Sequence, residues 1–138
     1  MESCCMSNHE AWLKIAQEDL KAAEGLLALE LFSPVTYHCQ QSAEKSLKAY
    51  LVFKKHSIVR THDLIQLVEL CMKFDRGFED IFDATNALNP FSTKFRYPTE
   101  YDIPDFDDAE KAIGQAHEVL IFVLQKILNS KFGQKDLF

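Results

Sequence analysis

The 138-residue sequence has few of the residues that build turn-rich folds, with only four glycines and four prolines. This content argues against a collagen-like chain and against a β-protein with many tight turns. No apolar run approaches the roughly 20 residues that a membrane-spanning helix needs. Basic residues are also the minority, because 15 Lys and Arg stand against 21 Asp and Glu and leave a net charge of −6. This balance excludes a large basic surface for nucleic acid, although it leaves room for a local basic pocket.

The four cysteines form no recognisable metal or redox motif. Cys4 and Cys5 are adjacent near the N-terminus, whereas Cys39 and Cys71 fall on apolar helical faces. None belongs to a Cys-x-x-Cys pair or has a histidine at the spacing of a zinc site, so we expect no metal site. The first residues, MESCCMSNHE, lack the basic and apolar regions of a secretory signal. Together these features predict a cytoplasmic protein with reduced thiols and no membrane association.

Helical periodicity, in contrast, runs through most of the sequence. Apolar residues recur at steps of three and four, and no segment shows convincing period-two alternation. The chain is therefore predicted to be an all-α bundle of about five helices. The expected helices cover 9–31, 34 to about 55, 62–74, 78–88 and a last segment that starts after Pro104. We expect one helical domain over 9–130, with a flexible N-terminal tail at 1–8 and a C-terminal tail at 131–138.

Capping residues give the expected starts of two of these helices. Ser33 is predicted to be the N-cap of the second helix, with Pro34 at its first position, where the missing N–H costs nothing. Thr61 is the expected N-cap of the third helix, which would make His62 its first residue. A helix N-terminus favours a neutral imidazole and can hold an anion, so His62, next to Arg60, is a candidate general base or anion site. A local capping or packing role is the alternative.

One residue interrupts the apolar face that is predicted for the first helix. Asp19 falls in the middle of that face, where a carboxylate is costly unless it is paired or hydrogen-bonded. A neighbouring helix could supply the partner, or the carboxylate could have a functional role. Six residues make up the expected face: Trp12, Ile15, Ala16, Ala23, Leu26 and Leu27.

The second predicted helix has a continuous polar stripe opposite its apolar face. His38, Gln41, Lys45 and Lys48 are spaced three, four and three residues apart, so they share one side of the helix. Two lysines and a histidine one turn apart could bind phosphate. A plain solvated helix face is the alternative interpretation.

A long connection, Asn89–Phe106, separates the last two predicted helices. Connections of this length are uncommon and are often functional. It contains Lys94-Phe95-Arg96-Tyr97, in which basic and aromatic residues alternate in a way that suits base stacking with phosphate contact. The alternative is a lid whose aromatic residues pack onto the bundle.

Taken together and in order, these segments resemble the HEPN family (higher eukaryotes and prokaryotes nucleotide-binding). The resemblance covers roughly residues 9–128 and rests on four short motifs. Trp12 with Ala16-x-x-Asp19-Leu20-x-x-Ala23 is similar to the first helix of the family. The other three motifs are His38-x-Gln40-Gln41-Ser42-Ala43-Glu44-Lys45-x-Leu47-Lys48-Ala49, Thr61-His62-Asp63-Leu64-x-x-Leu67 and Phe95-Arg96-Tyr97-Pro98.

The resemblance implies a five-helix up-and-down bundle that forms a homodimer. Members of the family occur beside a minimal nucleotidyltransferase, often as a toxin–antitoxin pair. Many members are metal-independent RNases in which an Arg is followed four to six residues later by a His. In such a site the His would act as general base on a 2′-OH and the Arg would stabilise the phosphorane.

This sequence departs from the RNase motif, because Arg60 is followed by His62 after only two residues, and no His follows Arg76 or Arg96 within six. The leading prediction is therefore a non-catalytic homodimeric module that binds a nucleotide or a nucleotidyltransferase partner, with no cofactor other than such a nucleotide. One alternative is a metal-independent RNase that uses His62 or His38 with Arg96, and another is a purely structural oligomerisation module. The residues that the resemblance assigns to binding of the nucleotide or partner are His38, Gln41, Lys45, Lys48, His62, Arg96 and Tyr97. Asp19 is assigned to a polar network, with His38, Lys45 and Arg96 as candidate partners, and the alternative is that the whole set is an internal network that organises the bundle.

Overall fold

Helix α2 lies at the centre of the molecule, and most of its length is buried. The computed structural model describes residues 8–94 and 103–136, with side chains up to residue 131. The described residues contain no strand, which confirms the prediction of an all-α fold. The elements are α1 (Asn8–Ala28), α2 (Phe32–Phe53), α3 (Leu64–Phe74), η1 (Arg76–Ile81), α4 (Phe82–Leu88), η2 (Asn89–Ser92) and α5 (Phe106–Asp136).

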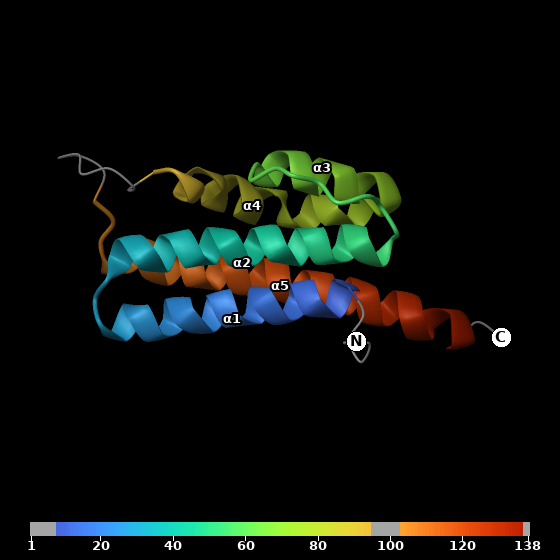
Figure 1. Cartoon of the computed structure of the whole chain (residues 1–138), viewed down its shortest axis with the longest axis horizontal. Helices are drawn as coiled ribbons and strands as arrows, with labels where there is room; N and C mark the ends of the chain where they lie inside the picture. The colour runs from blue at the N-terminus through green and yellow to red at the C-terminus, as the bar shows by residue number, and fades with distance from the viewer. Residues whose placement is uncertain (1–7, 95–102, 137–138) are drawn as a thin grey trace.

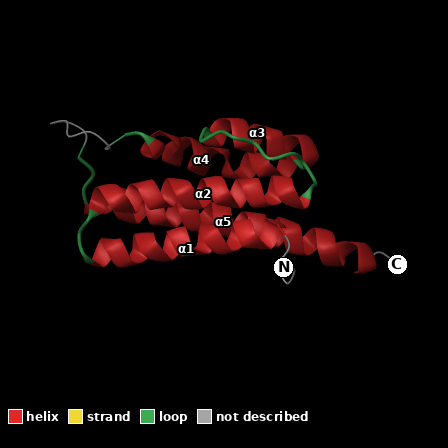
Figure 2. Ribbon diagram, viewed as in Figure 1, coloured by secondary structure: helices red, strands yellow, loops and turns green. Residues whose placement is uncertain are grey.

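The other helices surround α2 in an up-and-down arrangement (Figure 1). A short turn joins α1 to α2, so these two helices run antiparallel and pack along their length. Helix α5 lies against both of them, while α3 and α4 cover another side of α2. Figure 2 shows that the connection between α2 and α3 runs back along the bundle before α3 begins. This connection carries His62 back toward the middle of α2.

Small residues bring α1 and α2 close together. Ser42 Oγ donates a hydrogen bond to the carbonyl oxygen of Ala16 at 2.8 Å, and Ala16 and Ser42 are both fully buried. The buried face of α1 consists of Leu13, Ala16, Leu20 and Ala23, at the spacing of helix–helix packing.

The prediction that Ile15 belongs to the core is wrong, since 43% of this residue is exposed. The buried stripe of α1 is centred on Leu13 and Leu20 instead. As a result Asp19 lies at the edge of the stripe, on the flank that faces α2, and not in its middle.

The predicted starts of α2 and α3 are also wrong. Helix α2 begins at Phe32, so Ser33 and Pro34 lie inside its first turn, where proline is tolerated because no intrahelical bond needs its nitrogen. Helix α3 begins at Leu64, and its N-cap is Asp63, whose carboxylate accepts from the backbone nitrogen of Ile65 at 3.0 Å. His62 therefore precedes the N-cap and is not part of the helix. The predicted fourth helix is a 3₁₀ turn, η1, followed by the short helix α4.

Helix α5 starts where the sequence predicts, just after Pro104. Asp105 and Asp108 cap each other, because each side chain accepts a hydrogen bond from the other residue's backbone nitrogen, at 2.8 and 3.0 Å. The helix continues to Asp136, so 131–136, which we expected in a C-terminal tail, is helical. Figure 1 shows that this end of α5 extends past the start of α1. Within 8–94 and 103–136, no helix combines the length and the hydropathy needed to cross a membrane.

Candidate functional site

Asp19 of α1 contacts two residues of α2. Its Oδ1 accepts from His38 Nδ1 at 2.9 Å, and its Oδ2 accepts from Lys45 Nζ at 3.0 Å. The three side chains are partly buried, with 14% of Asp19, 32% of His38 and 19% of Lys45 exposed. We call these three residues the Asp19 cluster. His38 and Lys45 are seven residues apart, two helical turns, so one carboxylate from α1 can lie between them.

A second carboxylate, that of Glu44 on α2 itself, also contacts one lysine and one histidine. Glu44 Oε2 accepts from Lys48 Nζ at 2.9 Å, and Glu44 Oε1 accepts from His62 Nδ1 at 2.9 Å. The Glu44 side chain is only 3% exposed, whereas that of His62 is 75% exposed. Gln41 adds a longer contact of 3.4 Å to the same Oε1. Together with Gln40, these residues form the Glu44 cluster.

Gln40 holds the backbone of His62, and Glu44 holds its imidazole ring. The fully buried Gln40 donates from Nε2 to the carbonyl oxygen of His62 at 3.0 Å and accepts from Gln41 Nε2 at 2.7 Å. His62 is thus an exposed side chain held at two points by buried partners from α2.

Both clusters orient a histidine in the same way. A carboxylate can only accept hydrogen bonds, so Nδ1 of His38 and of His62 must carry the proton. In the neutral ring, Nε2 is then the acceptor and the site of proton uptake. This is the arrangement by which a carboxylate positions a histidine for acid–base chemistry or for recognition of a donor.

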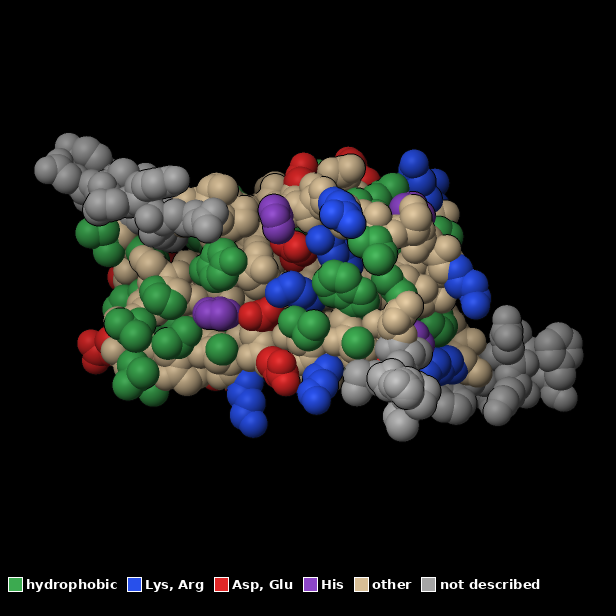
Figure 3. All heavy atoms as spheres, viewed as in Figure 1, with side chains coloured by type: hydrophobic (Ala, Val, Ile, Leu, Met, Phe, Trp, Pro, Cys, Tyr) green, Lys and Arg blue, Asp and Glu red, His purple; other side chains and the backbone are tan. Residues whose placement is uncertain are grey.

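The two clusters form one surface, which we call the polar face. In the space-filling view, histidine, acidic and basic side chains gather in two places between hydrophobic ones on the side where α1 and α2 are visible (Figure 3). Lys48 Nζ also lies 5.7 Å above the ring of Trp12, so the Glu44 cluster reaches the start of α1.

The structure brings together five of the residues that the sequence placed in the binding site, together with Asp19 of the predicted polar network: His38, Gln41, Lys45, Lys48 and His62. Two others, Arg96 and Tyr97, lie outside the described residues. Asp19 has two partners, His38 and Lys45, which resolves the question of how its charge is compensated. Among the described residues, no group of three or more His, Cys, Asp or Glu side chains could hold a metal ion.

Glu44 and Gln40 belong to the site, although the sequence did not predict them as site residues. The available signal for Glu44 was its spacing of four residues from Lys48, which favours an ion pair on one helix face. The contact to His62 joins residues 18 positions apart, so helical spacing could not reveal it. Gln40 gave no comparable local signal, since its partner is a backbone oxygen of the connection.

Fold and site together define a five-helix up-and-down bundle with a polar face on its central helix, where carboxylates orient His38 of that helix and His62 of the following connection. The chain belongs to the HEPN family, because the model of the HEPN domain matches residues 9–127. A protein of Methanocaldococcus jannaschii, named "Putative toxin MJ1304", is 26% identical to the chain and aligns over 91% of each sequence.

Two solved structures share the fold. The crystal structure of TT1696 from Thermus thermophilus has a TM-score of 0.79 and 25% identity, and the match covers 88% of this chain and 99% of that protein. The crystal structure of ST0689, an archaeal HEPN homologue, has a TM-score of 0.72 and 26% identity with the same coverage. The chain therefore spans nearly the full length of these relatives.

Proposed function

We propose that this protein is a homodimeric HEPN component of a toxin–antitoxin pair, which binds a nucleotidyltransferase partner through the polar face. The observation that carries the proposal is the repeated carboxylate–histidine–lysine contact, which presents two oriented histidines on one surface. The similarity to the Methanocaldococcus jannaschii protein over most of both chains supports the toxin–antitoxin assignment.

The charge balance of the polar face favours a protein partner over a free nucleotide or RNA. Lys45 and Lys48 each have a carboxylate oxygen within 3.0 Å, so neither ammonium is an isolated positive charge. Affinity for nucleic acid depends on cations that replace counterions at phosphates. Protein interfaces, in contrast, combine satisfied polar groups with apolar ones. Ile15, which is 43% exposed, supplies an apolar side chain on α1. A nucleotide is the alternative ligand for this face.

The homodimer part of the proposal is supported by exposed apolar residues on α5. Ile121 and Leu128 are 40% and 51% exposed, and their spacing of seven residues puts them on the same side of the helix. A second copy that covered this side would remove both from water.

A second candidate function, metal-independent RNA cleavage, is favoured by one contact. Buried Glu44 orients the exposed ring of His62, as a general base requires. Under this alternative, His62→Ala would abolish cleavage of RNA in the presence of a chelator while it kept its thermal stability within a few degrees, because the His62 side chain is exposed. Glu44→Gln would also abolish cleavage, but it would lower stability as well because it removes the charge that pairs with buried Lys48. A protein that cleaves no RNA under these conditions would rule this alternative out.

Native mass spectrometry of the protein, isolated from its own cells at physiological salt, tests the leading proposal. We expect two copies of the chain together with a nucleotidyltransferase polypeptide. Two copies with a bound nucleotide would keep the polar face as a binding site but replace its ligand. A folded protein that carries neither would overturn the proposal.

A further inference from the structure

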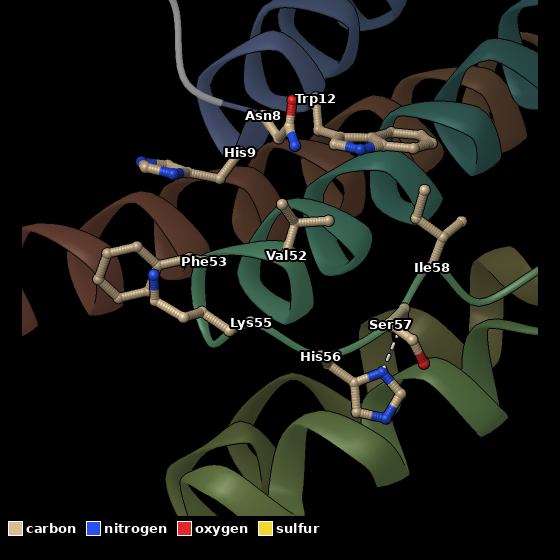
Figure 4. Close-up of a pocket in the computed structure, with 9 residues that line it drawn as sticks. All are labelled: Asn8, His9, Trp12, Val52, Phe53, Lys55, His56, Ser57 and Ile58. Atoms are coloured by element: carbon tan, nitrogen blue, oxygen red, sulfur yellow. Dashed lines mark hydrogen bonds between the residues drawn. The ribbon is translucent and has the colours of Figure 1, made fainter.

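An open cavity of about 720 Å³ lies where the start of α1, the end of α2 and the following connection meet. Its volume is within the range of roughly 300–1,000 Å³ that is typical of small-molecule sites. Figure 4 shows Trp12 and Ile58 on one side of the cavity and His9 and Phe53 on the other. None of the residues that form the two clusters of the polar face lines it.

Aromatic rings form much of the lining. His9 and Phe53 contact each other edge to face, with ring centroids 5.1 Å apart and planes at 73°. Burial lowers the pKa of His9, nearby Lys131 lowers it further, and Glu10 opposes them. The His9 ring is therefore neutral at neutral pH and adds an aromatic surface rather than a charge. With Trp12 opposite, the cavity is suited to a flat aromatic ring.

Polar groups are concentrated along one edge of the cavity. Lys55, His56 and Ser57 follow one another in the chain at this edge (Figure 4). His56 Nδ1 donates to the carbonyl oxygen of Ser57 at 2.7 Å, and the His56 ring also contacts Phe74, so its orientation is fixed. The Lys55 side chain extends toward Phe53 in Figure 4, so its ammonium lies at the aromatic end of the lining, where it is suited to contact an anionic group.

The backbone of Lys55 has the left-handed conformation of a helix C-terminus. Its φ of 62° is left-handed, and it closes α2 with hydrogen bonds from Lys55 N to Val52 O and from His56 N to Leu51 O, both 2.9 Å. Glycine is the usual residue at this position of a helix end, because other residues are strained there. The closed helix end fixes the backbone of Lys55, and its side chain lines the cavity.

We propose that this cavity binds a small molecule that combines a planar aromatic ring with one anionic group. The ring lies between Trp12 and the His9–Phe53 pair, and the anion contacts Lys55. Two classes of molecule combine such a ring with an anionic group: nucleoside monophosphates and aromatic carboxylates. The proposal does not depend on the partner of the polar face, since the cavity is lined by other residues.

Trp12 is the only tryptophan of the chain and reports directly on the cavity. Titration of the full-length protein with AMP, with phenylacetate and with inorganic phosphate, followed by Trp12 fluorescence, tests the proposal and separates the sources. We expect a saturable change with at least one aromatic anion and none with phosphate alone, and the tighter of the two aromatic ligands identifies the source. No saturable change with either aromatic anion would overturn the proposal.

Variants of Lys55 test the role of its charge. Lys55→Gln removes the charge but keeps a polar side chain only one atom shorter, and it should weaken binding of the aromatic anion about tenfold or more. Lys55→Gly should weaken binding as much as Lys55→Gln does. It should nevertheless melt at a higher temperature than the wild type, because glycine adopts the left-handed φ without strain.

Glu30 offers a matched control, because it closes α1 with a φ of 59° and the same pattern of hydrogen bonds, from Glu30 N to Leu27 O and from Leu31 N to Leu26 O. Glu30→Gly should also melt at a higher temperature but bind as the wild type does. Equal affinity of Lys55→Gln and the wild type would contradict the assigned site.

Discussion

Glu44 is the residue that connects the core of α2 with the exposed His62. It is almost completely buried, and its charge is compensated by Lys48, itself only 8% exposed. A buried pair of this kind contributes little net stability compared with apolar residues, but removal of one partner leaves the other charge buried and unpaired. Glu44 therefore determines both the position of His62 and the protonation of its Nδ1.

Replacement of Glu44 should show how strongly its ion pair with Lys48 affects the stability of the fold. Glu44→Leu should lower the free energy of unfolding by about 3 kcal/mol, because it leaves the Lys48 ammonium without its carboxylate in a buried site. The double variant Glu44→Leu/Lys48→Met should recover at least half of the loss. Urea denaturation of the three proteins measures both values. A single variant as stable as the wild type would show that the two charges are not coupled.

Asp75, which is outside the polar face, forms an ion pair with Lys126 of α5. Its Oδ2 accepts from Lys126 Nζ at 2.9 Å, and its Oδ1 accepts from the backbone nitrogen of Gly77 at 2.8 Å. The hydrogen bond from Lys126 lowers the pKa of the Asp75 carboxyl below its ordinary value of 3.8, and the Gly77 bond adds to this, whereas burial opposes it. The stabilisation is thus present above the unfolded pKa and is lost as the pH falls through the folded one.

Asp75→Asn should consequently be less stable than the wild type at pH 7, by no more than about 1 kcal/mol since the pair is partly exposed. The difference should shrink below pH 3.8 and disappear once the wild-type carboxyl is protonated. Denaturation curves at pH 7, 5 and 3 test this, with Asp80→Asn as the control on an exposed carboxylate of η1. A difference that stays constant with pH would contradict the assigned charge pairing.

At the scale of helices, Asn89 joins the start of α3 to the end of α4. Its Oδ1 accepts from the backbone nitrogen of Leu64 at 2.7 Å, and its Nδ2 donates to Asp63 Oδ1 at 3.0 Å. The first N–H groups of a helix have no partner within it, so a side chain from another element satisfies one of them here. The same contact holds Asp63, the N-cap of α3, in place.

Asn89→Ala should lower the free energy of unfolding by about 1–2 kcal/mol, because the partly buried Leu64 N–H loses its acceptor. Hydrogen exchange of the Leu64 amide should become faster while exchange within α2 stays slow. Asn86→Ala, on the exposed side of α4, is the matched control and should change neither. Unchanged exchange at Leu64 in Asn89→Ala would show that the side chain does not hold this helix end.

The elements show which parts of the fold the sequence could predict. Apolar periodicity indicated the helices, because it reflects burial along a whole helix face. It missed the start of α3, because Thr61 and Asp63 can both cap a helix and the choice depends on Asn89, 26 residues beyond Asp63. For the site, spacing within α2 put His38, Gln41, Lys45 and Lys48 on one side. Spacing could not reveal Asp19 as the partner of His38 and Lys45, or His62 as the partner of Glu44, because only the folded chain brings these residues near each other.

The whole molecule presents two distinct features around the α1–α2 hairpin. The polar face lies over the packed middle of the two helices, and the aromatic cavity lies where α1 starts and α2 ends. Trp12 joins them, because its ring lines the cavity and Lys48 of the Glu44 cluster lies above it at 5.7 Å. A partner on the polar face and a small molecule in the cavity would therefore occupy neighbouring sites on one chain.

The most direct test of the central claim compares native mass spectra of the wild type with those of two single-residue variants, all expressed in the native host. We expect that the wild type and Asn86→Ala, which changes an exposed residue of α4 outside the polar face and the exposed side of α5, carry the nucleotidyltransferase partner, and that His62→Ala loses it at least tenfold while remaining folded. Equal occupancy by the partner in His62→Ala and the wild type would contradict the assignment of the polar face as the binding surface.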